Sequence, residues 1–353
     1  MSHNWPTGLT HGDCLEVLSV EQSRKADLVY LDPPYFLNRE FHLDVRRVDT
    51  RFKGNWNEQE VLEHIAHISK LNSTKGLDSY LSWLYERLAA IRSVMSSTGS
   101  IFLHIGTREA PAVSLVLDEL FGAGNWRSTI TWQRSHPHNN VTRNLGNVSD
   151  FIFYYSMSNE YVFNLLHTPH DETYLNNSFN NSDDRGQYAL APIIQERSRK
   201  GNQFEYRGLT PPNGWRVKRE ELERLDKDGY IHWGANRPYK KIYLAEARGA
   251  PLQNIWTDLS NITRTEIDRR RYPTQKPLRL LERIVQMASN PGDLVLDPFC
   301  GSGTTLVAAK LHGRNFYGID ISSDALSVAA ERLAEAEMTQ PELFVGVEAQ
   351  LSE

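Results

Sequence analysis

The chain of 353 residues has only two cysteines, Cys14 and Cys300, which are too few for a disulfide-stapled scaffold. No apolar run approaches the about 18 residues of a membrane-spanning helix. Residues 1–12 lack the basic start and the apolar stretch of a signal peptide. These absences predict a cytoplasmic protein without a membrane partner. The composition, 40% hydrophobic and 24% charged, is that of a globular chain long enough for one large or two modest domains.

The net charge of -5 argues against a uniformly basic nucleic-acid binder, but it conceals an asymmetry. Residues 195–283 hold 20 Lys and Arg against 12 Asp and Glu, whereas the rest of the chain holds 19 against 32. A basic segment on an acidic body is typical of a phosphate-binding face. A solvated charged face is the alternative.

Apolar, β-branched runs alternate with longer stretches of helical periodicity, which predicts βαβ units and a doubly wound, mostly parallel α/β sheet. The expected strands are 26–31, 100–105, 128–132, 150–155, 293–296 and 315–319. The expected helices are 80–95, 110–120, 277–288, 304–311 and 322–336. Asn-, Pro- and Gly-rich stretches interrupt this rhythm between about residues 159 and 268, which indicates an inserted second domain.

The richest local signal is LVLDPFCGSGTT at 294–305, followed by a helical pattern and by NFYGIDIS at 315–322. Glycines after a strand let backbone amides approach a ligand closely, because glycine has no Cβ. Asp320 ends the next expected strand, where an acid can accept hydrogen bonds from ribose hydroxyls. The dinucleotide fingerprint fails because Leu306 replaces its last glycine. The motif therefore indicates an adenosine-containing cofactor, with an ordinary tight turn as the alternative.

A second signal is Asp32-Pro33-Pro34-Tyr35, directly after the strand ADLVYL. Two prolines end the strand in a rigid turn at the carboxyl edge of the sheet. Such a turn presents a carboxylate, a carbonyl and an aromatic ring to one small volume, which suits a planar amine. A strand-end turn with a packed tyrosine is the alternative.

These motifs resemble the DNA methyltransferases that methylate amino groups with S-adenosylmethionine, whose signature is [DNS]-P-P-[YFW]. TQKP at 274–277 and GDCL at 12–15 are similar to two further elements of that family. The order, with DPPY early and DPFCGSG late, resembles the β arrangement of restriction-modification enzymes. The resemblance covers nearly the whole chain. It implies a seven-stranded Rossmann-like sheet divided into a catalytic half (1–158), an inserted target-recognition domain (159–268), a cofactor half (269–340) and a tail (341–353).

The resemblance also implies the cofactor site. Asp297, Phe299, Gly301 and Gly303 would surround the methionine part of S-adenosylmethionine, and Asp320 would bind the ribose. Asp13 would contact the adenine amine, although a helix cap at Cys14 explains it equally well. Thr274 and Lys276 would close the pocket from a helix start, with an exposed lysine as the alternative at 276.

The implied reaction is direct methyl transfer to an exocyclic amine, without a metal or a covalent enzyme intermediate. The Asp32 carboxylate and the Pro33 carbonyl would each accept one amine hydrogen. The base would be flipped out of the duplex onto Tyr35, with help from Phe36 or Trp132. The chain lacks a Pro-Cys dipeptide, the nucleophile setting for methylation of cytosine carbon 5.

Asp32 favours the 6-amino group of adenine, because the first position of the signature is more often Ser in cytosine 4-amino methyltransferases. The cytosine amine is the alternative. Methylation of a protein glutamine and a nicotinamide-dependent oxidoreductase are weaker alternatives; the second leaves DPPY without a role.

The implied partner is double-stranded DNA, and the resemblance leaves open a homodimer and a cognate restriction endonuclease. Arg269, Arg270 and Arg271 are the candidate phosphate contacts, with a solvated helix end as the alternative. The tryptophans at 215, 233 and 256 are expected in the core of the inserted domain. His136 and His138 lack metal-ligand spacing.

Overall fold

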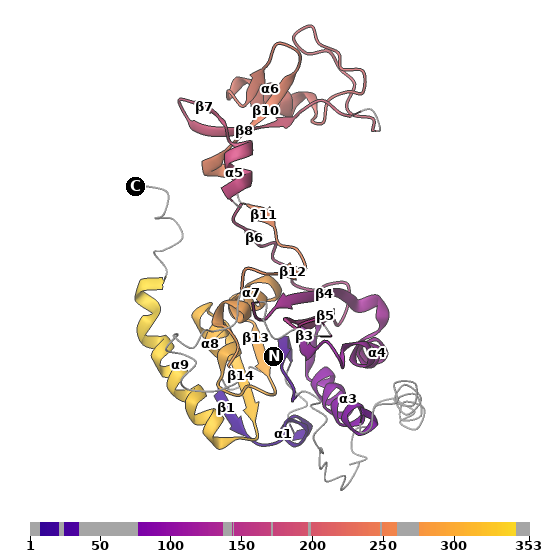
Figure 1. Ribbon diagram of the computed structural model, residues 1–353, viewed down its shortest axis with the longest axis vertical. Helices are drawn as coiled ribbons and strands as arrows, with labels where there is room; N and C mark the ends of the chain where they lie inside the picture. The colour runs from indigo at the N-terminus through magenta and orange to yellow at the C-terminus, as the bar shows by residue number, and fades with distance from the viewer. Residues whose placement is uncertain are drawn as a thin grey trace. The chain divides into compact units, whose positions relative to one another are not determined.

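The computed structural model describes residues 8–20, 25–34, 77–136, 143, 145–170, 172–196, 199–247, 249–259 and 275–343. The described residues form two compact units. The first is drawn from Met1–Leu165 and Gln253–Val347, and the second from Leu166–Leu252 (Figure 1). That the second unit recognises the target, and the domain boundaries expected from the sequence, stay predictions.

The first unit is built on one mixed sheet, in which only β5 runs antiparallel to its neighbours. This arrangement confirms the doubly wound, mostly parallel α/β fold. The sheet has one strand more than the seven expected, because the two-residue β12 pairs with the edge of β4. The order of the strands is β1 (Gly8–His11), β14 (Asn315–Asp320), β13 (Leu294–Asp297), β2 (Ala26–Leu31), β3 (Met95–Gly106), β5 (Ser149–Ser156), β4 (Trp126–Gln133) and β12 (Ile255–Trp256).

Helices lie on both sides of this sheet (Figure 1). On one side are α1 (Cys14–Val20), α3 (Leu77–Ser93) and α4 (Ala110–Phe121), which is followed by the short η1 (Ala123–Asn125). Their buried leucines and valines share one apolar core with β2, β3 and β13. On the other side are α7 (Leu278–Ala288), α8 (Thr304–Leu311) and α9 (Ser323–Leu343). None of the described helices is long and apolar enough to cross a membrane; the cytoplasmic location stays a prediction.

The carboxyl ends of the parallel strands β14, β13, β2 and β3 meet at one edge of the sheet, where open α/β sheets bind their ligands. The reversed strand β5 brings its amino end to the same edge, because Asp150 pairs with Gly106 at the end of β3. Polar residues from five strands and from the loops after them are therefore brought to this edge of the sheet.

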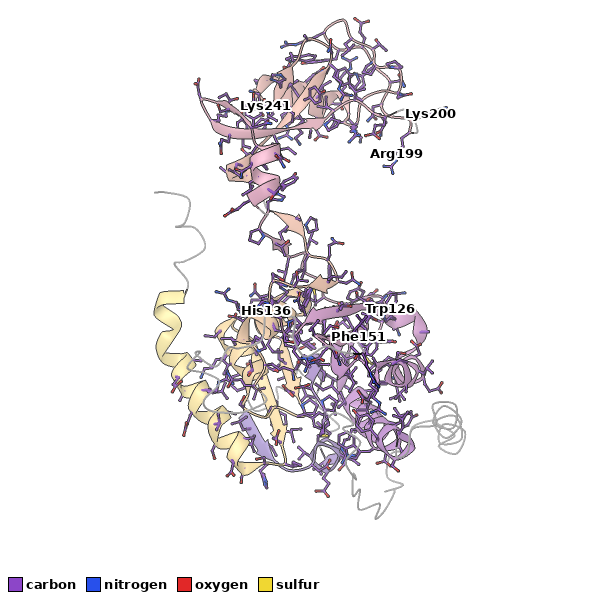
Figure 2. All side chains as sticks on the ribbon, viewed as in Figure 1. Trp126, His136, Phe151, Arg199, Lys200 and Lys241 are labelled. Carbon is purple, nitrogen blue, oxygen red and sulfur yellow. The ribbon has the colours of Figure 1, made fainter. Side chains whose placement is uncertain are left out.

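The second unit has its own antiparallel sheet of β7 (Asn181–Asp183), β8 (Gly186–Pro192), β10 (Pro238–Tyr243) and β9 (Ile231–Trp233). Around it lie α5 (Glu172–Ser178), α6 (Arg219–Lys227), η2 (Leu244–Glu246) and the pair of β6 (His167–Thr168) with β11 (Ala250–Pro251). Arg199 and Lys200 are exposed on a loop, and Lys241 of β10 bonds Asp183 at 2.6 Å (Figure 2).

Trp215 is fully buried in the core of the second unit, and Trp233 packs against the same cluster. Trp256 is also buried, but it lies on β12 of the first unit. Placing it in the inserted domain was therefore wrong. The sequence does not indicate that Trp256 belongs to the first unit, because the chain returns to that unit at Gln253, before the polar composition of the insert ends.

Candidate active site

A cavity of about 520 Å³ opens at the carboxyl edge of the large sheet. Its walls come from the turn before α1, the end of β2, one face of α3, the segment before α7, and the loops after β13 and β14. Motifs that lie almost 300 residues apart in the sequence therefore face one volume. A cavity of this size accommodates a small-molecule cofactor.

Asp297, the last residue of β13, is the most deeply buried acid of the cavity, with 3% of its surface exposed. Burial raises the pKa of its carboxyl to about 7, although a hydrogen bond from Thr305 and the backbone N–H of Phe299 lower it. The nearby charges of Asp32 and Asp320 raise that pKa further. A carboxylate in this state binds a cationic group strongly, because a positive charge relieves both penalties.

Asp320 ends β14, and its carboxylate accepts hydrogen bonds from the loop after β13 and from the loop after β14. One carboxylate oxygen accepts the backbone N–H of Gly301 at 2.8 Å, and the other accepts that of Ser322 at 2.9 Å. Each carboxylate oxygen has a second lone pair, so the side chain can still accept hydroxyl hydrogens from a ligand. Its place on the cavity wall fits the ribose contact expected from the sequence.

The two glycines of the loop after β13 have different surroundings. Gly301 lines the cavity and has a φ of 47°, in the left-handed region that favours glycine. Gly303, with a φ of 75°, is not among the described residues that line the cavity. A Cβ on Gly303 would lie 2.7 Å from the Cβ of Ala329, so this glycine lets α9 approach the loop. Arg332 of α9 is buried and donates to the Ser302 carbonyl at 2.7 Å and to the Thr304 hydroxyl at 2.9 Å.

Asp13 caps α1, because one of its carboxylate oxygens accepts the backbone N–H of Leu15 at 2.8 Å. The other oxygen accepts a hydrogen bond from Arg87 of α3. The Arg87 guanidinium lies 4.3 Å from the ring centroid of Trp83, and Trp83 packs against Phe299 with centroids 5.8 Å apart. The helix cap considered in the sequence is therefore present, in a residue that also lines the cavity.

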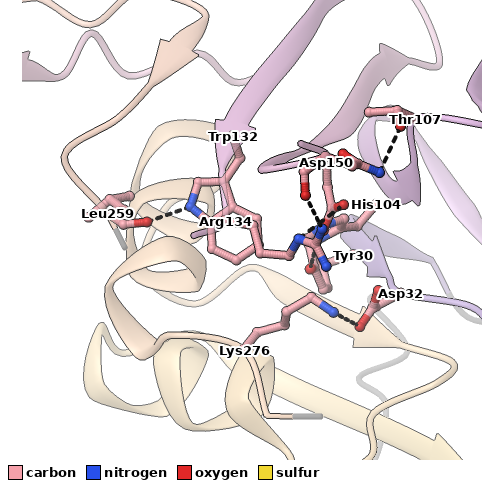
Figure 3. Close-up of polar contacts among 10 residues, drawn as sticks. Tyr30, Asp32, His104, Thr107, Trp132, Arg134, Asp150, Leu259 and Lys276 are labelled. Carbon is pink, nitrogen blue, oxygen red and sulfur yellow. Dashed lines mark hydrogen bonds and ion pairs between the residues drawn. The ribbon is translucent and has the colours of Figure 1, made fainter. Parts of the chain in front are cut away.

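Asp32 follows β2 and is the catalytic carboxylate expected from the sequence. Its Oδ2 accepts a hydrogen bond from the Lys276 ammonium, and both side chains are mostly buried (Figure 3). Lys276, expected to close the cofactor pocket, thus bonds the carboxylate of the DPPY motif. Pro34 also lines the cavity, whereas Pro33 is buried and is not among the lining residues described.

Five of the expected site residues lie outside the described part of the chain. They are Tyr35, Thr274, Arg269, Arg270 and Arg271. Phe36 and His138 also lie outside it, and His136 is exposed (Figure 2). The expected roles of these residues stay predictions.

Sequence reasoning placed Gln275 in the segment that closes the pocket, but it missed Tyr30, Trp83 and Arg87 of the cavity wall. Trp83 and Arg87 are four residues apart, so they share one face of α3 and carry a detectable helical signal. Tyr30 lies two residues before Asp32 on β2, so the alternation of a strand gives both side chains one face. No sequence signal identifies the partner of Tyr30, which is His104 on β3.

Both cysteines are buried and lie near acids, Asp13 for Cys14 and both Asp297 and Asp320 for Cys300. Burial raises the pKa of Cys14 to about 12, and burial raises that of Cys300 still further above its ordinary value. Both thiols therefore stay protonated at neutral pH, which disfavours thiolate chemistry at this site.

A family model described as DNA methylase, the N6/N4 methyltransferase family, matches residues 26–331. The type II methyltransferase M.EcaI of Enterobacter cloacae is 32% identical over 317 residues, which cover 89% of this chain and 66% of that protein. The Mod subunit of the type III restriction-modification enzyme StyLTI of Salmonella typhimurium is 25% identical, over 83% of this chain and 48% of that protein. The chain thus spans about two thirds and about half of these two relatives.

The chain is also similar to the DNA adenine methyltransferase YhdJ of Escherichia coli K12. The two are 25% identical over 329 residues, which cover 92% of this chain and 82% of YhdJ.

Proposed function

The chain belongs to the N6/N4 DNA methylase family, and we propose that it transfers the methyl group of S-adenosylmethionine to the 6-amino group of adenine in double-stranded DNA. One observation carries the proposal. Adjacent strands β13 and β2 deliver two carboxylates, Asp297 and Asp32, to a single cavity. We assign the first to the cationic cofactor and the second to the amine that receives the methyl group.

The residues present fit S-adenosylmethionine. Asp297 is a buried carboxylate whose raised pKa makes a positive ligand group favourable there. Asp320 offers hydroxyl acceptors at the neighbouring strand end, and Phe299 with Trp83 offers an aromatic wall. When bound, the cofactor supplies a methyl group activated as a sulfonium.

Asp32 supplies the acceptor for the target amine. In the structure its carboxylate already bonds an amino nitrogen, the ammonium of Lys276. An exocyclic amine of a base is a poor nucleophile, because its lone pair is delocalised into the ring. Acceptors fixed on its hydrogens localise that lone pair and orient the nitrogen. We propose that the Asp32 carboxylate and the Pro33 carbonyl accept the two amine hydrogens, and that Tyr35 is the stacking surface for the flipped base.

Adenine is the proposed base for two reasons. Asp32 occupies the first position of the DPPY signature, where cytosine amino methyltransferases more often have Ser. The similar protein YhdJ is named a DNA adenine methyltransferase. The same two acceptors can hold the 4-amino group of cytosine, so this amine is the second candidate.

DNA is the partner that the family supports. We propose Arg269, Arg270 and Arg271 as phosphate contacts, on the strength of the basic excess in residues 195–283. A second copy of the chain and a cognate restriction endonuclease stay predictions.

The test is the identity of the methylated nucleoside. The protein is expressed in a host without DNA methylation, and the DNA is digested to nucleosides for mass spectrometry. The proposal predicts the 6-methylamino derivative of deoxyadenosine. A 4-methylamino deoxycytidine would correct the base and keep the chemistry, whereas a carbon-methylated cytosine or unmodified DNA would overturn the proposal. The inactive control is Asp32→Ala, which removes the proposed amine acceptor.

A further inference from the structure

A buried chain of three polar side chains leads from Tyr30, in the cavity wall, into the large sheet. The Tyr30 hydroxyl lies 2.9 Å from Nδ1 of His104, and Nε2 of His104 lies 3.2 Å from Oδ2 of Asp150 (Figure 3). The three residues are 2%, 0% and 2% exposed. They come from β2, β3 and β5, which are neighbours in the sheet, and only Tyr30 reaches the cavity wall.

The direction of these hydrogen bonds follows from the chemistry of the groups. A carboxylate can only accept, so Nε2 of His104 carries a hydrogen and donates it to Asp150. Burial, together with the charge of Lys276, holds the pKa of His104 below its ordinary value, so the imidazole is neutral and Nδ1 is an acceptor. Burial raises the pKa of Tyr30, which keeps its hydroxyl protonated. The Tyr30 hydroxyl therefore donates its single hydrogen to His104.

The surroundings keep this arrangement in one orientation. The Trp132 ring meets the His104 ring edge-on at 5.3 Å, and Arg134 Nε lies 3.5 Å from Oδ1 of Asp150. The charges of Lys276 and Asp32 act on His104 from the cavity side. Apolar side chains of similar size would fill this part of the sheet without the desolvation cost of a buried carboxylate, so a role for the polar chain is expected.

Tyr30 of β2 and Asp32, the first residue after this strand, are two positions apart and both line the cavity. The Asp32 charge is one of the causes that raise the pKa of Tyr30, so the two groups interact electrostatically. A tyrosine hydroxyl without another acceptor would donate its hydrogen bond to such a carboxylate and compete with an incoming amine. Because the Tyr30 hydroxyl donates its hydrogen bond to His104 instead, this competition does not arise.

We propose that Asp150 and His104 make Tyr30 a positioning residue that offers the cavity only an acceptor oxygen, and so keep the Tyr30 hydrogen away from Asp32, the proposed acceptor of the target amino group. This inference rests on the proposed methylation of an amine. It assigns a role in the reaction to three residues outside the DPPY motif and the glycine loop.

The decisive variant is Asp150→Asn, because asparagine has the shape of aspartate but reverses the direction of the hydrogen bonds along Asp150, His104 and Tyr30. Arg134 is a donor beside Oδ1, so it selects the amide oxygen of the new residue and turns the amide NH₂ toward Nε2 of His104. Nδ1 then carries the hydrogen and donates to Tyr30, whose own hydrogen is released toward Asp32. The single-turnover rate of methyl transfer should fall at least about tenfold, while the Kd of S-adenosylmethionine stays within about twofold.

The second variant removes the misdirected hydrogen. Tyr30→Phe alone should lower the methyl-transfer rate by only about threefold, because it removes an acceptor and a donor together. In the double variant of Tyr30→Phe and Asp150→Asn, no hydroxyl remains to compete for Asp32, so the rate should recover to that of Tyr30→Phe. A purely structural role predicts the opposite, a double variant slower than either single one.

A matched control exists elsewhere on the sheet. The Tyr155 hydroxyl donates to Asp118 of α4 at 2.8 Å, and neither residue lines the cavity. Asp118→Asn should leave the methyl-transfer rate unchanged, and thermal melting of all variants separates misfolding from chemistry. The inference is overturned if Asp150→Asn matches the parent rate, or if the double variant shows no recovery. Absence of amine methylation by the parent protein would instead overturn the proposed function.

Discussion

At the scale of single residues, the state of Asp297 controls binding of the cofactor. Its carboxyl, with a pKa of about 7, is half protonated near neutrality in the free protein. A cationic ligand binds the ionised form, so its affinity should rise as the pH rises through about 7, by at most about tenfold per pH unit. Titration calorimetry with S-adenosylmethionine at about pH 6 and about pH 8 measures this change. Buffers with different ionisation enthalpies should reveal a proton released on binding.

The matching variant is Asp297→Asn, which cannot ionise. Its binding should be weaker and the same at both pH values. Equal affinities of the parent protein at the two pH values, with no proton released, would contradict a cationic partner for Asp297.

Lys276 gives a second prediction at this scale. Its ammonium bonds Asp32, so Lys276→Met should change the methyl-transfer step while the Kd of S-adenosylmethionine stays within about twofold. Measuring both the single-turnover rate and the cofactor Kd of this variant tests whether Lys276 acts on methyl transfer and not on cofactor binding. Lys276→Arg, which keeps the charge, is the control and should stay closer to the parent. Weaker cofactor binding with a normal rate would support the cofactor role expected from the sequence instead.

The acids of the site were predictable from the sequence, because each ends a strand of a parallel sheet. Asp32, Asp297 and Asp320 follow short apolar runs, and strand ends of this kind meet at one edge. His104 and Asp150 were not predictable as partners of Tyr30. Their contact depends on the reversal of β5, which no local pattern in residues 149–156 reveals.

At the scale of elements, the packing of α9 against the loop after β13 depends on Gly303. Gly303→Ala combines a left-handed backbone conformation with a Cβ that would lie 2.7 Å from Ala329, so it should lower the free energy of unfolding by about 2–4 kcal/mol. Urea unfolding measures the change. Gly292→Ala is the control, because Gly292 has a φ of 89° but no described atom within 4 Å of its new Cβ.

Gly292→Ala should therefore lower the free energy of unfolding only through the strained backbone conformation, by about 1–2 kcal/mol. The double variant of Gly303→Ala and Ala329→Gly should recover part of the stability, since it removes the methyl group that the new Cβ would meet. Equal decreases for Gly303→Ala and Gly292→Ala would contradict a packing role for Gly303.

Element positions were predicted well where apolar periodicity was strong, as in β2 and α8. β3 extends from Met95 to Gly106, well beyond the expected 100–105, because its polar first half pairs only at Met95 before a shift in register. β1 was not predicted, since four residues without an apolar run become a strand only by pairing with β14.

At the scale of the whole molecule, the positive charge is less concentrated in the second unit than the sequence segment suggests. Residues 166–252 hold 14 Lys and Arg against 12 Asp and Glu, a small excess. Of the basic excess of eight in residues 195–283, five lie in residues 195–252 and are partly offset by the acidic residues 166–194. The other three come after this unit, where Arg269, Arg270 and Arg271 lie outside the described residues.

Neutralising these three arginines together should weaken DNA binding and make the dependence of log affinity on log salt shallower, by about 0.9 for each phosphate that is no longer neutralised. Cofactor affinity should not change, because Asp297 and Asp320, which we assign to the cofactor, lie at the ends of β13 and β14. Fluorescence anisotropy over a range of salt concentrations measures the slope. An unchanged affinity and slope would place the arginines away from the DNA.

In the proposed reaction, Asp32 holds an amino nitrogen while the residues around Asp297 hold S-adenosylmethionine. The most direct measurement is single-turnover transfer of labelled methyl to unmethylated DNA by the parent protein and by Asp32→Ala, with the cofactor Kd measured for both. We expect label on an exocyclic amine with the parent protein. For the variant we expect a rate at least about 100-fold lower, at an unchanged cofactor Kd. Near-parent turnover by Asp32→Ala would show that Asp32 does not hold the reacting amine.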